Sequence, residues 1–204
     1  MPKKKLTKKE SFNKTSLKIG KVISKLGISP NGWTFISLIF AIVAAIFIIK
    51  QNLLVGSIFF LISILLDLFD GAVARATEKV TKFGGFFDTV VDRYVESLII
   101  FSLLFVSLPN LFLPIYVWLF VLLFGSLMTT YIKAAAREKG LVNEDLRGGF
   151  LGRFERTVII FLGLIIGSFI PIVLSWVIFI LAILANWAAI QRFILARKQE
   201  KNKK

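Results

Sequence analysis

Residues 53–75 read LLVGSIFFLISILLDLFDGAVAR. The segment begins as an apolar run without charge and then acquires two carboxylates, Asp67 and Asp70, followed by Gly71 and Arg75. About 20 helical residues cross the hydrocarbon core of a bilayer, so this run predicts a membrane-spanning helix. An aspartate at the middle of such a helix costs about 2.5–3.5 kcal/mol, and aspartates kept there usually have a function. The segment therefore predicts both a membrane fold and a functional site within it.

The rest of the chain has the same membrane character. It has 204 residues, of which 56 % are hydrophobic and 21 are Phe, and its mean hydropathy is +0.79. A soluble domain of this length needs more polar surface. We therefore predict an all-α integral membrane protein with six transmembrane helices. The six apolar stretches lie near residues 33–50, 53–75, 84–107, 112–136, 154–170 and 172–195.

The formal net charge of +14 is unevenly distributed along the chain. Lys and Arg gather in residues 1–30, 131–156 and 192–204, whereas the turns near 108–111 and 170–172 contain none. This alternation is the positive-inside pattern, which predicts a multi-pass protein of the cell membrane with both termini and the active site towards the cytoplasm. Nucleic-acid binding would need basic side chains on one accessible face, so we do not expect a nucleic-acid partner.

The sequence contains one membrane domain, residues 31–197, between a basic N-terminal segment, residues 1–30, and a basic cytoplasmic tail, residues 198–204. In the N-terminal segment, apolar residues recur from Leu6 to Leu26 with Lys on the opposite side. That pattern predicts an amphipathic juxtamembrane helix on the cytoplasmic surface, where Lys side chains meet anionic headgroups. A leader that only solubilises the chain and orients it is the alternative interpretation.

The chain has no Cys and no His. Disulfides, zinc–thiolate sites, imidazole ligands and nucleophiles that depend on Cys or on a Ser–His pair are therefore excluded. Any chemistry must use carboxylates, hydroxyls, Lys, Arg or the backbone.

Four aspartates form two pairs on consecutive predicted helices. Asp70 lies three positions after Asp67, and Asp92 lies four positions after Asp88, so each pair occupies one helix face. A short loop near residues 76–82 joins the helices, which places both pairs at one level. An all-oxygen site suits Mg²⁺ or Mn²⁺, and two such ions would neutralise four carboxylates, as in two-metal phosphoryl transfer. A cation or proton transporter also uses intramembrane aspartates and remains the alternative from another class.

The residues around the aspartates fit a phosphate ligand. Gly71 follows Asp70 directly, and Gly84 and Gly85 open the next span, so backbone can approach closely at both places. Arg75 lies two turns beyond Asp67 on roughly the same face, where a guanidinium can bind phosphate.

Together these residues form a spaced motif of eight positions: Asp67, Asp70, Gly71, Ala74, Arg75, Gly84, Asp88 and Asp92. The motif resembles the signature of the CDP-alcohol phosphotransferase family at every position, and the family's six spans fit the six apolar stretches. The resemblance implies that Asp67, Asp70 and Asp88 bind one metal, that Asp67, Asp88 and Asp92 share a second, and that Asp92 is the general base for the acceptor hydroxyl. It also implies a homodimer and a CDP-lipid donor. The donor contacts that it implies are Pro30, Asn31, Gly32, Trp33, Gly71, Arg75 and Thr81.

A second group of segments is similar to phosphatidylinositol phosphate synthases and their archaeal counterparts: Thr130–Ala134, Gly140–Leu141 and Gly148–Arg156. Phe154 departs from that pattern, which usually carries proline there. In those enzymes basic residues hold the phosphate of the acceptor, and the matching residues here are Lys133, Arg153 and Arg192. The resemblance therefore implies transfer of the phospholipid moiety from CDP-diacylglycerol or CDP-archaeol to inositol phosphate, with release of CMP. Glycerol 3-phosphate is the alternative acceptor.

The basic residues also allow an interpretation without the resemblance. Lys133, Arg153, Arg156 and Arg192 stand at the predicted cytoplasmic ends of three spans. Three such cations around one cavity can bind a phosphate dianion. Alternatively, they anchor the helices by snorkelling to lipid headgroups. For Arg156, which follows Glu155, both interpretations remain open.

Overall fold

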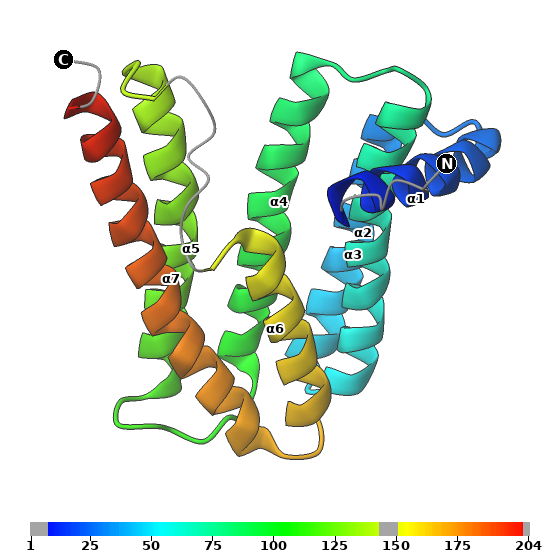
Figure 1. Ribbon diagram of the computed structural model, residues 1–204. Coiled ribbons are helices and arrows are strands. Elements are labelled where there is room, and N and C mark those ends of the chain that lie inside the picture. Colours follow the sequence, from blue (N-terminus) through cyan, green and yellow to red (C-terminus); the bar gives the residue numbers. More distant parts are fainter. Residues whose placement is uncertain (1–7, 143–150, 202–204) are drawn as a thin grey trace, which may run out of the picture. The chain divides into compact units, whose positions relative to one another are not determined.

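In the computed structural model, which describes residues 8–142 and 151–201, every named element is a helix, as the composition predicts (Figure 1). The Gly148–Phe150 part of the second motif lies outside the described residues, as do the ends of the predicted basic N-terminal segment and tail. The helices in chain order are α1 (Lys8–Ile23), the 3₁₀ helix η1 (Ser24–Leu26), α2 (Pro30–Ile49), α3 (Leu53–Ala76), α4 (Lys82–Ser102), the 3₁₀ helix η2 (Leu103–Phe105), α5 (Ile115–Glu138), α6 (Arg153–Gly167) and α7 (Pro171–Lys201).

Helices occupy all six stretches for which spans are predicted. Four of them, α2, α3, α5 and α7, are long and apolar enough to cross a membrane. The fifth, α4, carries Asp88, Asp92, Arg93 and Glu96 within its 21 residues. The sixth, α6, has 15 residues and is therefore about 22 Å long, shorter than the roughly 30 Å hydrocarbon core. Four helices of the described residues thus have the length and composition of membrane spans, which indicates a multi-pass membrane protein.

The chain forms two compact units. The first consists of Met1–Ala44 and Ile58–Val95, and the second of Ala45–Ser57 and Glu96–Lys204. All four motif aspartates belong to the first unit, and the three candidate acceptor cations belong to the second.

In the first unit, small residues bring α1 and α2 against α3. A Cβ atom built on Gly20 of α1 would collide with the carbonyl group of Ala72 in α3, so the two backbones are in contact there. Between α2 and α3, the Ser63 hydroxyl donates to the Ser37 carbonyl oxygen over 2.8 Å. These close contacts place the start of α2 and the end of α3 on one side of the unit, where the aspartates begin.

Small residues form the face of α1 that packs against α3, and apolar residues of the predicted amphipathic helix are exposed. Ser16 and Gly20 are buried, whereas Leu17, Ile19 and Val22 are 38 %, 43 % and 67 % exposed. The small residues face α3 because small side chains allow backbone contact between helices. The larger apolar side chains of α1 are therefore exposed on this unit.

In the second unit, α5 and α7 lie side by side, and α6 packs against α7 (Figure 1). The α5–α7 contact centres on Gly125 and Asn186, because a Cβ atom on Gly125 would lie 2.5 Å from Asn186 Nδ2. The same Nδ2 atom donates to the carbonyl oxygens of Val121 at 2.9 Å and Ala182 at 2.8 Å. An amide held by two carbonyls inside an apolar helix pair fixes the register of α5 against α7.

Candidate metal and phosphate site

Three of the four motif aspartates meet in the first unit. Asp67 and Asp70 from α3 and Asp88 from α4 each present a carboxylate oxygen, and these oxygens all lie within 4.8 Å of one another. Asp70 is buried, and the other two side chains are half-buried. The grouping follows from helix geometry, since residues three apart share a face and the α3–α4 connection is short.

This arrangement fits a hard divalent cation. The oxygens around one octahedral ion with bonds of 2.0–2.1 Å lie about 3–4 Å apart, which the spacing of the three carboxylates allows. Thr34 of α2 adds support, because its hydroxyl donates to Asp70 Oδ2 over 2.6 Å in a buried position. Hydrogen bonds of this kind orient a metal ligand and tune its affinity.

Asp92 lies one turn beyond Asp88 on α4 and is buried, with 8 % of its surface exposed. It is not one of the three residues whose oxygens come within 4.8 Å. The structure therefore separates the four aspartates into a group of three and a neighbour further along the same helix.

A cavity of about 330 Å³ opens beside Asp70 and Asp88. Its other lining residues come from α2, the end of α3, the α3–α4 connection and the start of α4: Pro30, Asn31, Thr34, Gly71, Ala74, Arg75, Lys79, Val80, Thr81, Gly84 and Gly85. Five of the seven predicted donor contacts are among them, and Gly32 and Trp33 are not. The Gly32 N–H instead donates to Ser29 Oγ over 3.1 Å, and Trp33 is buried with its ring edge-on to Phe69.

Gly84 and Gly85 in the first turn of α4 line this cavity. Thr81 caps the helix, because its Oγ1 atom accepts the N–H of Gly84 at 2.9 Å. A Cβ atom on Gly84 would lie 3.0 Å from Thr81 Oγ1 and 3.2 Å from Asn31 Oδ1, so glycine is what lets α2 approach the cap. A helix N-terminus carries partial positive charge, which favours a phosphate nearby.

Arg75 supplies the cavity with a full positive charge. A Cβ atom on Gly71 would lie 3.2 Å from Arg75 Nη1, so the missing side chain leaves room for the guanidinium one turn later on α3. Arg75 Nη2 donates to Ser16 Oγ of α1 over 2.8 Å. Lys79, which the sequence motifs do not mark, is a second cation among the lining residues.

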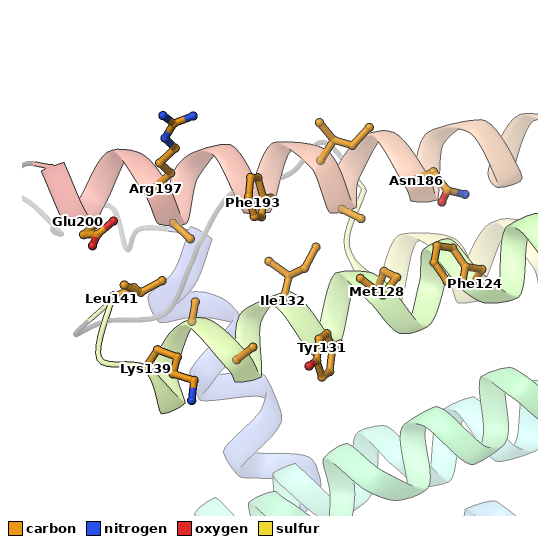
Figure 2. Close-up of a pocket in the computed structure, with 15 residues that line it drawn as sticks. Phe124, Met128, Tyr131, Ile132, Lys139, Leu141, Asn186, Phe193, Arg197 and Glu200 are labelled. Atoms are coloured by element: carbon orange, nitrogen blue, oxygen red, sulfur yellow. The ribbon is translucent and has the colours of Figure 1, made fainter.

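A larger cavity of about 730 Å³ lies between α5 and α7 in the second unit (Figure 2). Apolar side chains such as Phe124, Met128 and Phe193 make most of its wall. Its charged lining residues, Lys139, Arg197 and Glu200, stand towards the C-terminal ends of the two helices, and none of the described residues that line it is an aspartate. The carboxylate chemistry is therefore assigned to the smaller cavity.

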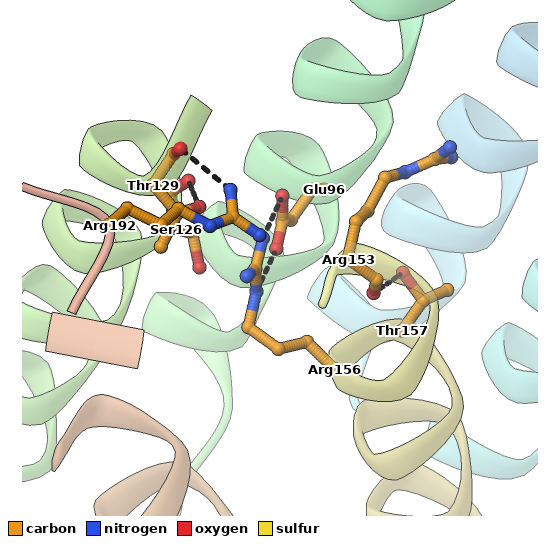
Figure 3. Close-up of polar contacts among 7 residues, drawn as sticks. All are labelled: Glu96, Ser126, Thr129, Arg153, Arg156, Thr157 and Arg192. Carbon is orange, nitrogen blue, oxygen red and sulfur yellow. Dashed lines mark hydrogen bonds and ion pairs between the residues drawn. The ribbon is translucent and has the colours of Figure 1, made fainter. Parts of the chain in front are cut away.

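The predicted acceptor cations are half-buried in the second unit. Lys133 lies on α5, Arg153 is the first residue of α6, and Arg192 lies on α7. Arg192 Nη1 donates to the carbonyl oxygen of Thr129 over 2.7 Å, which links α7 to α5 (Figure 3).

Neither interpretation of Arg156 made from the sequence is correct. The side chain is fully buried and forms a two-pronged ion pair with Glu96 of α4, with Nε 2.8 Å from Oε1 and Nη2 3.2 Å from Oε2 (Figure 3). Its neighbour Glu155 is exposed, because consecutive residues of a helix do not face each other. Arg156 therefore joins α6 to the end of α4 and is directed neither to solvent nor to headgroups.

Comparison with known proteins gives a match over most of the chain. The family model described as CDP-alcohol phosphatidyltransferase matches residues 27–199. Archaetidylinositol phosphate synthase of Pyrococcus horikoshii is 35 % identical over 170 residues, which are 80 % of this chain and 86 % of that protein. The synthase of the same name from Methanothermobacter thermautotrophicus is 32 % identical over 144 residues, 70 % of each chain. Phosphatidylinositol phosphate synthase of Mycobacterium tuberculosis, solved in complex with manganese and citrate, has a TM-score of 0.78 and 25 % identity, and the match covers 89 % of this chain and 88 % of that one.

Proposed function

Because the chain belongs to the CDP-alcohol phosphatidyltransferase family, we propose that it transfers the phospholipid moiety of a CDP-lipid to a hydroxyl of inositol phosphate and releases CMP. The observation that carries this proposal is the group of three aspartate oxygens within 4.8 Å beside a cavity that also contains Arg75. The names of the relatives support the choice of acceptor, since they are archaetidylinositol phosphate and phosphatidylinositol phosphate synthases.

Asp67, Asp70 and Asp88 would hold one divalent ion, Mg²⁺ or Mn²⁺. Asp92 would hold a second ion together with Asp67 and Asp88. When bound, such ions offset the charge of a diphosphate and of the oxygen that leaves it. The all-oxygen donor set and the manganese in the mycobacterial structure support this assignment.

The donor's diphosphate would lie in the 330 Å³ cavity, between Arg75 and the capped start of α4. Both are positive, and the partial charge at the start of α4 adds to the full charge of the guanidinium in favouring a diphosphate there. The cytidine would lie at the start of α2, on the segment Pro30–Trp33. Pro30 and Asn31 line the cavity and support this part of the proposal.

Asp92 would act as the general base. Its carboxylate takes the proton of the acceptor hydroxyl, and the hydroxyl oxygen then forms a bond to the phosphorus nearest the lipid. The bond from that phosphorus to the CMP oxygen breaks, and CMP leaves with the electron pair. Bound reactants make this a direct displacement that needs no covalent enzyme intermediate.

Lys133, Arg153 and Arg192 would bind the phosphate of the acceptor. Replacing Lys133 or Arg153 by alanine should raise the KM for inositol 1-phosphate by about tenfold or more, because each charged hydrogen bond contributes about 1.5–3 kcal/mol. The KM for the CDP-lipid should change little. Lys139→Ala is the matched control, since Lys139 is an exposed lysine just beyond α5. Equal effects on both substrates would contradict the phosphate pocket.

We further propose that α4 and α6 span the membrane with the other four helices, with both termini and the site in the cytoplasm. The absence of Lys and Arg from the turns near residues 108–111 and 170–172 supports this orientation. The family match from residue 27 to 199 supports a single membrane domain with a basic segment and a basic tail at its ends. We expect a homodimer, as the family resemblance implies.

The proposed function is tested by measuring CMP release with Mn²⁺ and either CDP-diacylglycerol or CDP-archaeol. The acceptors to compare are inositol 1-phosphate, glycerol 3-phosphate, free inositol and serine. Inositol 1-phosphate should give the highest kcat/KM. A preference for glycerol 3-phosphate would reassign the acceptor, and activity with serine or free inositol alone would overturn the phosphate pocket. Metal-dependent flux across liposomes without any CMP release would show a transporter.

A further inference from the structure

Helix α1 contacts the helix of the donor cavity through two buried small residues. Ser16 and Gly20 lie one turn apart on α1, and both face α3. The glycine allows backbone contact, because a Cβ atom there would collide with the Ala72 carbonyl and would lie 2.8 Å from Ala76 Cβ. Ser16 is only 8 % exposed, and its hydroxyl oxygen accepts the Arg75 Nη2 hydrogen bond at 2.8 Å.

We propose that Ser16 is a positioning residue for the donor's diphosphate, because its hydroxyl holds the Arg75 guanidinium at the cavity. In this view α1 is a part of the donor site as well as a juxtamembrane helix. The inference rests on the proposed function, since it takes the ligand of the cavity to be a CDP-lipid.

Arg75 needs such a support because of where it stands. It lies in the last turn of α3, and its side chain is exposed and long. A flexible arginine loses side-chain entropy when it binds a phosphate, and holding it in its binding conformation beforehand removes that loss. Ser16 and Gly71 act from two sides, because Ser16 bonds Nη2 while the absent Gly71 side chain leaves space beside Nη1.

The bond to Ser16 leaves Arg75 able to bind phosphate. A guanidinium has five N–H donors, and the serine takes one of them. The remaining donors include those of Nη1, and a planar pair of N–H groups can bind two phosphate oxygens at once. A serine suits this position because its hydroxyl is neutral, so the full charge of Arg75 stays available to the ligand.

The test uses the full chain in detergent micelles, with CDP-diacylglycerol, inositol 1-phosphate and Mn²⁺. Ser16→Ala should raise the KM for CDP-diacylglycerol about five- to tenfold, which is less than the effect of losing a charged hydrogen bond to the ligand itself, because Arg75 is still present. The kcat and the KM for inositol 1-phosphate should stay within about twofold of the wild-type values, and Ser16→Thr should restore the donor KM. Ser24→Ala is the matched control, since the Ser24 hydroxyl bonds the Lys21 carbonyl oxygen within its own segment.

A double variant tests whether Ser16 acts through Arg75. Arg75→Ala alone should raise the donor KM, and adding Ser16→Ala to it should change nothing further. Ser16→Cys, which has a similar size but a weak acceptor, provides the same comparison if Ser16→Ala is not recovered as folded protein. An unchanged donor KM in Ser16→Ala, or an equal further rise in the Arg75→Ala background, would overturn the inference.

The outcomes also separate this inference from the proposed function. A fall in kcat and in melting temperature at an unchanged donor KM would show that Ser16 only stabilises the α1–α3 contact, and would overturn the positioning role alone. A wild-type chain that releases no CMP from any donor and acceptor would reject the proposed function, and the inference with it.

Discussion

Replacing Asp92 by asparagine should lower CMP release by about 10²- to 10⁴-fold while CDP-lipid binding persists. Asparagine keeps the shape of the side chain but cannot take the proton of the acceptor hydroxyl. A general base typically contributes 10²- to 10⁴-fold, so we expect kcat to fall by about that factor. Donor binding should survive because the three carboxylates that meet within 4.8 Å are Asp67, Asp70 and Asp88. The measurements are CMP release and equilibrium binding of radiolabelled CDP-diacylglycerol in the presence of Mn²⁺.

Asp88→Asn is the control for this prediction. Asp88 belongs to the group of three, so its loss should weaken Mn²⁺ binding and metal-dependent donor binding together with turnover. Near-normal turnover in Asp92→Asn would reject the base assignment. Loss of donor binding in Asp92→Asn to the same extent as in Asp88→Asn would show that Asp92 acts as a metal ligand only.

The helices could be predicted from the sequence because apolar runs of membrane length have few alternatives. The boundaries were less certain where polar residues enter the run. The third predicted stretch, residues 84–107, becomes α4 up to Ser102 and then the short helix η2. The motif residues Asp88 and Asp92, together with Arg93 and Glu96, make α4 more polar than the four helices that are apolar enough to cross a membrane.

Helix packing could not be predicted because its determinants are small residues with distant partners. Gly20 meets Ala72, and Gly125 meets Asn186. A glycine in an apolar helix contributes nothing to hydrophobic periodicity, so the pattern that predicts a helix does not show which helix it contacts. The apolar periodicity of the N-terminal segment likewise did not show that Ser16 and Gly20 form the packed face of α1.

The aspartate group was predictable for a local reason. Its residues lie three apart on one helix and just beyond a short connection, so helix geometry alone brings them together. The supporting hydroxyls were missed, since Thr34 is 36 residues from Asp70 and Ser16 is 59 residues from Arg75. A lone hydroxyl in a helix has several ordinary uses, such as a bond to its own backbone, and so gives no signal of a distant partner.

The Glu96–Arg156 ion pair was also not predictable from the sequence, and its loss is the second change for which we expect a large effect. The partners are 60 residues apart, and both side chains are at least 96 % buried. Arg156→Met should destabilise the protein by about 3–5 kcal/mol, because it leaves the Glu96 carboxylate buried without its counter-charge. The double variant Glu96→Leu/Arg156→Met should recover most of this loss, since an apolar pair of similar volume is often as stable as a buried ion pair. Thermal unfolding in detergent, followed by size-exclusion chromatography, measures both variants.

Lys139→Met is the matched control, because Lys139 pairs with Glu138 at 3.6 Å while both side chains are more than 70 % exposed. An exposed pair contributes about 0–1 kcal/mol, so this variant should unfold close to the wild type. An Arg156→Met variant as stable as Lys139→Met, or a double variant less stable than either single one, would contradict the prediction. CMP release by the double variant then separates two roles of the pair. Glu96 follows Asp92 by one turn of α4, so a folded double variant with a low kcat would mean that the ion pair also sets the position of the proposed base.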